Sequence, residues 1–179
     1  MPFPRLAFVI PLRRPLRKNT IPSPSVRTPY NSRRLVKIMS TPAVTRNPGD
    51  MIGAVNVLGT PLALHSLSPP TGFFRNGFCD TNASDIGSHT VAGILTGPFL
   101  SFTASRGNDL RRSGLTPGCR WCLCVSRWKE AYEAYKAGKI PRDAVPRVVL
   151  EATHQRAVDK AEGSAKSVDV GMLKEFAGV

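Results

Sequence analysis

The chain has 179 residues, which fits a single domain, and its 25 Lys and Arg against 12 Asp and Glu give a net charge of +13. Residues 1–49 hold ten of the basic residues and no acidic one, so residues 50–179 carry 15 basic and 12 acidic residues, or +3. Such a small excess predicts no nucleic-acid partner for the body of the chain. No apolar run approaches the roughly 20 residues that a membrane span needs, so we expect no membrane partner.

The basic segment is a leader rather than part of the fold. It contains nine of the 16 prolines, and its Ser, Thr and Arg residues leave little apolar surface to bury. This composition predicts a disordered leader over residues 1–50, followed by one compact domain over residues 51–179. An Arg-rich, acid-free leader is typical of a mitochondrial transit peptide, although a plain disordered tail has the same composition. Translation from Met39 would instead give a cytoplasmic form.

Within the body, β-branched runs alternate with segments of helical periodicity. Thr96 is a suitable N-cap for a short helix, with Pro98 in its first turn, and Ser126 for a longer one, which Gly138 ends. Strands are predicted over residues 89–96, 120–125 and 148–152, and helices over residues 97–106, 127–137, 155–162 and 169–177. This order predicts a small two-layer α+β domain, with a three- to four-stranded sheet and helices packed on one face.

Several blocks in the body, in a fixed order, resemble a widespread family of uncharacterised small proteins, a domain of unknown function. The blocks are NVLG (56–59), GSHT (87–90), GNDL (107–110), RWCLC (120–124) and ATH (152–154). The resemblance covers residues 56–176 and implies a compact α+β domain without an assigned biochemical role. The chain departs from the family pattern at Cys119, where an acidic residue is usual, and at Phe78, where a second cysteine is usual beside Cys79.

The cysteines allow two interpretations. With no secretory signal a disulfide framework is not expected, and Cys122 and Cys124 are predicted to be buried as small apolar side chains. They lie two residues apart on a predicted strand, so both face the same side of the sheet. The alternative is a zinc or redox site formed by Cys79, Cys122 and Cys124 with His89 or His154. Against zinc, the spacing supplies only one paired half-site, from Cys119 to Cys122.

Polar residues also gather at the predicted ends of strands, where α/β architectures expose functional groups. His89 begins a strand four residues after Asp85, a spacing that lets the carboxylate orient the imidazole. His154 stands at a strand-to-helix corner, and either histidine could equally be a capping residue. His65 lies outside the blocks that carry the family resemblance and is interpreted as incidental. The predicted binding residues are Asp85, His89, Asn108, Asp109, Arg120 and His154.

Two functions follow from these patterns. The preferred one is a soluble, non-catalytic binding or accessory module with its polar site at the ends of the sheet and no cofactor. The alternative is a thiol- or metal-dependent enzyme that uses Cys79, Cys122 and Cys124 with His89 or His154. The sequence contains no GxSxG nucleophile elbow, HExxH motif or GxGxxG loop, so no motif indicates another class of reaction.

Overall fold

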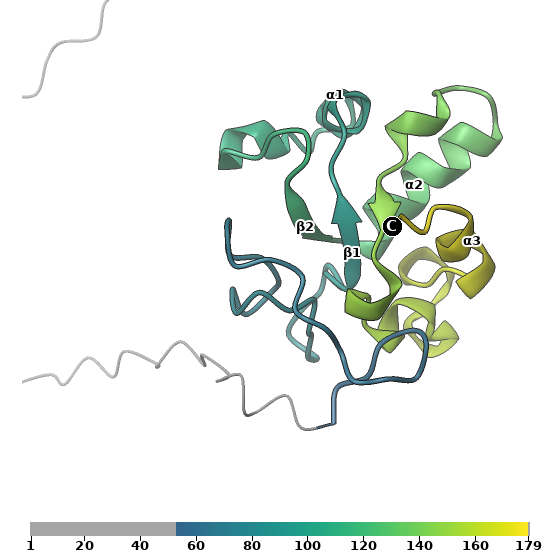
Figure 1. Cartoon of the computed structure of the whole chain (residues 1–179). Coiled ribbons are helices and arrows are strands. Elements are labelled where there is room, and N and C mark those ends of the chain that lie inside the picture. The colour runs from purple at the N-terminus through teal and green to yellow at the C-terminus, as the bar shows by residue number, and fades with distance from the viewer. Residues whose placement is uncertain (1–52, 179) are drawn as a thin grey trace, which may run out of the picture. The chain divides into compact units, whose positions relative to one another are not determined.

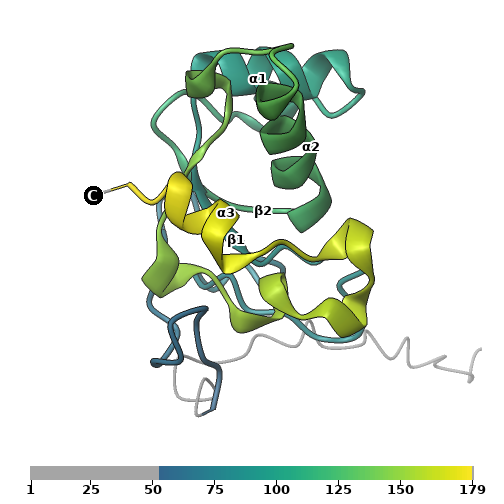
Figure 2. The same ribbon diagram turned by 90° about the vertical axis from the view of Figure 1, so that its right-hand side faces the viewer.

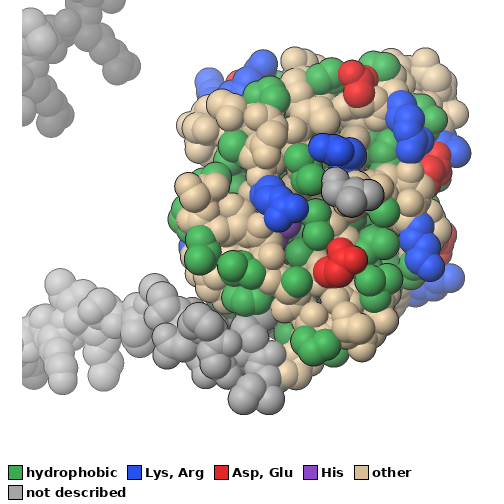
Figure 3. Space-filling model, viewed as in Figure 1, with side chains coloured by type: hydrophobic (Ala, Val, Ile, Leu, Met, Phe, Trp, Pro, Cys, Tyr) green, Lys and Arg blue, Asp and Glu red, His purple; other side chains and the backbone are tan. Residues whose placement is uncertain are grey.

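A computed structural model describes residues 53–178 of the chain (Figure 1). The predicted leader over residues 1–50, its transit-peptide interpretation and the alternative start at Met39 all lie outside these residues. Within residues 53–178, no helix is long and apolar enough to cross a membrane. On the face drawn in Figure 3, Lys and Arg side chains are scattered among acidic and apolar ones and form no continuous patch.

A three-stranded antiparallel sheet forms the centre of the fold. It contains β1 (Val91–Ile94), β2 (Arg120–Leu123) and β3 (Arg147–Val148), in the order β2-β1-β3. The third strand is shorter than predicted, because after Val149 the chain turns into a 3-10 helix, η4 (Leu150–Ala152). The turn brings the hydroxyl of Thr153 to the backbone N–H of Ala92, at 3.1 Å, where a longer strand would have supplied a carbonyl.

Three α-helices accompany the sheet: α1 (Gly97–Ser105), α2 (Val125–Lys136) and α3 (Val170–Glu175). Thr96 is the N-cap of α1, as predicted, with its hydroxyl accepting from the N–H of Phe99 at 3.1 Å. Helix α2 starts earlier than predicted, so that Cys124 rather than Ser126 takes the N-cap position. The predicted helix over residues 155–162 is two 3-10 turns instead, η5 (Gln155–Val158) and η6 (Lys160–Glu162). Further 3-10 turns are η2 (Leu110–Ser113), η3 (Arg142–Ala144) and η7 (Ser164–Lys166).

The two faces of the sheet are covered differently. Val91 and Leu123 pack with the helices into the main core, in which Trp128 of α2 is fully buried and donates its indole N–H to the carbonyl of Pro146 at 3.0 Å. Ala92 and Cys122 face the other way, into a small cluster beneath loops from the N-terminal part of the described chain. Figures 1 and 2 show α2 and α3 gathered on one side of the sheet. The predicted α+β class is therefore confirmed, with the helices on one face.

Candidate functional site

The register of β1 and β2 brings His89 and Cys124 to the same end of the sheet. Val91 at the start of β1 pairs with Leu123 at the end of β2. His89 lies two residues before Val91, and Cys124 directly follows Leu123. A hydrogen bond of 3.1 Å from the N–H of Val125 to the carbonyl of Ser88 extends the pairing beyond the strands. The two side chains that carry chemistry are thus neighbours although 35 residues separate them in sequence (124 minus 89).

Asp85 holds His89 at two points. One carboxylate oxygen, Oδ1, lies 2.6 Å from Nδ1 of the His89 ring, and the other, Oδ2, accepts the backbone N–H of His89 at 2.8 Å. The hydroxyl of Thr81 also donates to Oδ2, at 3.0 Å. The side chain of Asp85 is 1% exposed, whereas that of His89 is 36% exposed. A buried carboxylate therefore fixes the ring, and because Nδ1 is engaged, Nε2 is the nitrogen left for a second partner.

The Cys124 side chain, at the same end of the sheet, acts on this ring. Hydrogen bonding to the Cys124 side chain is the largest cause of a pKa of His89 raised to about 9. Burial opposes this shift, while the charge of the Cys124 sulfur and the bond from Asp85 add to it. A ring with this pKa is the proton carrier of a sulfur–imidazole pair. Asp85, His89 and Cys124 thus form a carboxylate–imidazole–thiol series.

The backbone around His89 is shaped to hold the ring. Ser88, directly before it, has a φ of 48°, a left-handed conformation that non-glycine residues seldom adopt. At Gly87, a Cβ atom would lie 2.5 Å from Cε1 of His89, so the ring occupies the space that any side chain there would need. The ring of His89 packs directly on the Gly87 backbone.

Cys124 holds the N-cap position of helix α2 without using its side chain as a cap. Its carbonyl accepts the N–H groups of Arg127 and Trp128, each at 3.1 Å, and its side chain makes no capping hydrogen bond. Cys124 is a free thiol and half-buried. The first-turn N–H groups of a helix favour an anion at its N-terminal end, where the sulfur of an N-cap cysteine lies.

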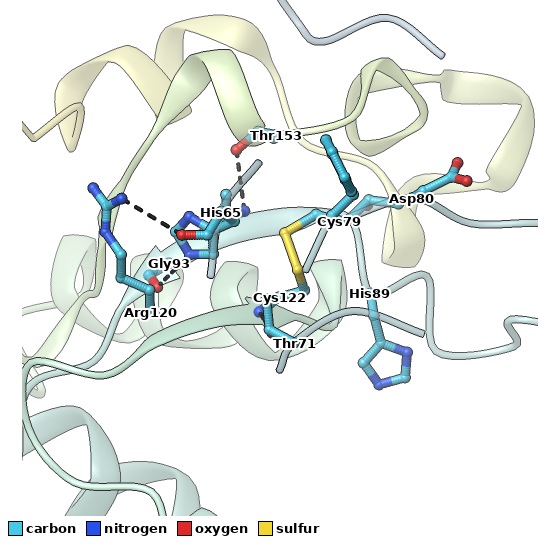
Figure 4. The surroundings of a disulfide bond; sticks show 12 residues. His65, Thr71, Cys79, Asp80, His89, Gly93, Arg120, Cys122 and Thr153 are labelled. Carbon is cyan, nitrogen blue, oxygen red and sulfur yellow. Dashed lines mark hydrogen bonds between the residues drawn. A yellow bond between two sulfur atoms is a disulfide. The ribbon is translucent and has the colours of Figure 1, made fainter. Parts of the chain in front are cut away.

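The cysteine predictions need correction, because Cys79 and Cys122 form a disulfide. Both residues are buried, at 0% and 2% exposed. Figure 4 shows this bond linking β2 to the loop that carries Cys79 and Asp80, with His89 on one side of it and His65 and Arg120 on the other. The expectation that Cys122 is an unpaired buried thiol is wrong. The same bond occupies two of the three sulfurs of the predicted metal set, and residues 53–178 contain no group of three His, Cys, Asp or Glu placed to hold a metal ion.

His154 lies near this end of the sheet but has a capping role. Its backbone N–H donates to the carbonyl of Thr90 at 3.0 Å, which places it beside the start of β1. Its ring Nδ1 accepts the N–H of Arg156 at 3.0 Å and so caps η5, while Nε2 lies 3.7 Å from Oδ1 of Asp80. Burial lowers the pKa of His154. Both ring nitrogens face protein groups, so the ring serves the structure.

The other predicted site residues lie elsewhere. Arg120 is at the opposite end of β2, paired with Ile94, and its guanidinium donates to the carbonyl of His65 at 3.5 Å. Asn108 donates to the hydroxyl of Thr103 at 3.1 Å, and Asp109 caps η2. The structure thus brings Asp85, His89 and His154 to one end of the sheet, and it does not join Asn108, Asp109 or Arg120 to them.

One buried histidine was not among the predicted site residues. His65 is 3% exposed, and its Nε2 lies 3.1 Å from the carbonyl of Gly93 in β1. Burial lowers the pKa of His65 to about 4, so the ring is neutral at neutral pH. Its Nδ1 has no hydrogen-bond partner within the described part of the chain. His65 thus has a structural place in the fold, and the apolar run just before it (residues 61–64) was a signal of its burial.

Residues 55–176 match the model of one protein family, described as an uncharacterised protein conserved in bacteria (DUF2237). The match includes Asp85, His89 and Cys124 and agrees with the family resemblance proposed for residues 56–176. No curated protein matches the chain.

Proposed function

The chain belongs to the uncharacterised DUF2237 family, whose description names no activity, and we propose from the geometry of its own residues that it is a thiol-dependent enzyme. Cys124 is the nucleophile, His89 the general base and Asp85 the residue that orients the base. The observation that carries this proposal is that a buried carboxylate binds an imidazole which the β1–β2 register brings to the same end of the sheet as a free thiol.

Each group in the series has the environment its role requires. Asp85 is buried and hydrogen-bonded to Nδ1, which fixes the tautomer and leaves Nε2 to exchange a proton with the sulfur. His89 is partly exposed, so a substrate can reach the face it shares with Cys124. This arrangement of nucleophile, base and orienting acid is the general pattern of activated-nucleophile sites.

The reaction class that fits is acyl transfer from an ester or thioester. The proton of the pair resides on His89, whose pKa is raised to about 9, and the sulfur of Cys124 adds to the carbonyl carbon. The His89 ring then returns the proton to the leaving alcohol or thiol as the carbon–oxygen or carbon–sulfur bond breaks, which leaves an acyl group on Cys124. Water, deprotonated by His89, releases the acid and restores the thiol.

A second candidate, the non-catalytic binding module, has one observation in its favour. A surface cavity of about 460 Å³ is lined by His154, Gln155, Arg156, Val158 and Asp159, beside the same end of the sheet. If binding there were the function, His154→Ala would weaken ligand capture while His89→Ala would leave it unchanged. The cavity does not include Asp85 or His89. This candidate therefore gives no function to the hydrogen-bonded pair that these two residues form.

An acyl-trapping experiment tests the enzyme proposal. The Cys119→Ser protein, kept oxidised, has Cys124 as its one free thiol among the described residues. Mixed with a nitrophenyl ester, it is expected to form a stoichiometric acyl adduct on Cys124, detected by intact-protein and peptide mass spectrometry, and then to release it. His89→Ala in the same background should slow acylation about a hundredfold, and the matched His154→Ala should not. An equal rate in the His89→Ala and His154→Ala proteins would refute the proposal.

A further inference from the structure

We infer that Cys79 and Cys122 are positioning residues of the proposed Cys124–His89–Asp85 site, which is assembled only while their sulfurs are joined. This inference rests on the proposed function. It concerns how the site is held together and how the redox state of the cell would control it, which the acyl-transfer chemistry does not itself require.

The disulfide completes a closed path of bonds and contacts that passes through all three site residues. From Cys124 the chain runs back through Leu123 to Cys122, whose sulfur is bonded to that of Cys79. From Cys79 it continues through Asp80 to Thr81, whose hydroxyl donates to Asp85 at 3.0 Å. Asp85 binds the His89 ring at 2.6 Å, and His89 interacts with Cys124. From Cys124 back to His89 the links are covalent bonds and hydrogen bonds, the effect of Cys124 on the His89 imidazole closes the path, and the sulfur–sulfur bond is the one link that a reductant can break.

Noncovalent contacts and the disulfide together hold this loop on β2. Residues 72–89 contain no helix or strand, so no regular ladder fixes Asp85 relative to Cys124. The loop, with Thr71 just before it, binds Cys122 in two ways: the hydroxyl of Thr71 accepts the Cys122 N–H at 2.7 Å, and Cys79 bonds its sulfur. Two noncovalent contacts accompany them: the Arg75 guanidinium lies over the Trp121 ring, 4.7 Å from its centroid, and the Ser88 carbonyl accepts the Val125 N–H at 3.1 Å. Gly72, with a φ of 87°, lets the loop pass so close that an added Cβ would lie 3.7 Å from the Cys122 sulfur. Cys122 therefore carries the one covalent link between the loop that holds the base and the strand that leads to the nucleophile.

The redox step balances with a low-molecular-weight thiol and its disulfide as the co-reactants. Reduction consumes two thiol molecules, transfers two electrons to the Cys79–Cys122 bond, and yields one small disulfide and two protein thiols. The reverse reaction forms a mixed disulfide on one cysteine, which the other displaces. Because both cysteines are buried, the exchange requires residues 72–89 to move away from β2 first.

Two proteins isolate the effect of the disulfide on the reactivity of Cys124. In each of them Cys124 is the one free thiol among the described residues. The Cys119→Ser protein keeps the disulfide, and the Cys79→Ala, Cys119→Ser, Cys122→Ala protein lacks it. The second-order rate of Cys124 alkylation by iodoacetamide is measured in both across about pH 5 to 10, with and without His89→Ala. With the disulfide, His89→Ala should lower the rate at neutral pH about tenfold or more; without it, His89→Ala should change the rate less than twofold.

The outcomes separate this inference from the proposal beneath it. An equal effect of His89→Ala in both backgrounds overturns the positioning role of Cys79 and Cys122 and leaves the enzyme proposal intact. No effect of His89→Ala in either background overturns the enzyme proposal itself. If the triple variant does not fold, the Cys119→Ser protein reduced with a phosphine takes its place, with Cys124 alkylation followed by peptide mass spectrometry. An unchanged Cys124 rate on reduction then overturns the positioning role.

Discussion

Asp85 and His89 are joined twice through one carboxylate, at 2.6 Å to the ring Nδ1 and at 2.8 Å to the backbone N–H of the histidine. A carboxylate that binds both the ring and the backbone of the same residue restricts the ring to one orientation, at a spacing of four residues in a segment without regular secondary structure. The orientation leaves Nε2 free of Asp85, and in the proposed site this nitrogen serves Cys124, through which the buried acid would act on a sulfur that it does not touch.

Replacing Asp85 by Asn should therefore alter His89 more than it alters the fold. The amide keeps the shape and one acceptor but loses the charge, so we expect the pKa of His89 to fall below about 9 toward its ordinary value. NMR titration of the His89 ring protons measures this directly. Asp109→Asn, which removes an exposed carboxylate paired with Arg111, is the matched control and should leave the His89 titration unchanged. An unaltered titration in Asp85→Asn would show that the carboxylate does not hold the ring.

Gly87→Ala tests the packing of the ring on the backbone. The new Cβ would lie 2.5 Å from Cε1 of His89, so the ring must swing aside, while the fold has no other contact there to lose. We expect Cys124 acylation to slow toward the rate of His89→Ala, with circular dichroism unchanged. Gly171→Ala in α3, where nothing lies within 4 Å, is the control and should leave acylation at the wild-type rate. Wild-type acylation in Gly87→Ala would mean that the ring position is unimportant.

The burial of His65 leads us to expect that the free energy of unfolding decreases in acid. Its pKa is lowered from 6.5 to about 4 by burial, so the unfolded chain binds the proton more tightly than the folded one. The folded state therefore loses stability as pH falls through 6.5 toward 4, by about 3 kcal/mol for this group.

The variant His65→Gln does not titrate and keeps an N–H donor for the Gly93 carbonyl. Urea unfolding at about pH 7 and pH 4 should show the wild type losing about 3 kcal/mol more than His65→Gln. Other acidic groups contribute equally to both proteins, so the difference isolates His65. Equal losses would place His65 in an environment that tolerates its charge.

The disulfide also contributes to global stability. The bond spans a sequence separation of 43, and cross-linking a loop of this length disfavours the unfolded chain by about 4 kcal/mol in the chain-entropy account. Cys79→Ala with Cys122→Ala should lower the free energy of unfolding by roughly this amount, measured by urea unfolding without reductant. Cys119→Ser, at a half-buried free cysteine, should change it by less than about 0.5 kcal/mol. A loss under about 1 kcal/mol in the double variant would show that the two sulfurs are not joined in solution.

The sequence predicted the parts of the fold that depend on local chemistry. The Thr96 cap of α1, the apolar strands and the placement of helices on one face follow from residue types at short spacing. The third strand was predicted too long, because its end depends on Thr153 reaching Ala92, a contact across 61 residues that no local pattern contains.

The site was predicted in part for the same reason. Asp85 and His89 lie four residues apart, so their pairing could be inferred locally. The approach of Cys124 to His89 depends on the β1–β2 register, and the Cys79–Cys122 bond on the path of an irregular loop. The sequence predicts Arg120 and Cys124 on one strand. In the structure they lie at opposite ends of β2 and therefore at opposite ends of the sheet. The prediction of one site at the strand ends did not say which end each residue occupied.

The central claim is that His89 activates Cys124, and the rate at which iodoacetamide alkylates Cys124 tests it most directly. In the oxidised Cys119→Ser protein at about pH 7, we predict that His89→Ala lowers this rate tenfold or more, and that the two proteins converge at alkaline pH, where the thiol ionises without help. Identical rates for the two proteins across the whole pH range would contradict the account.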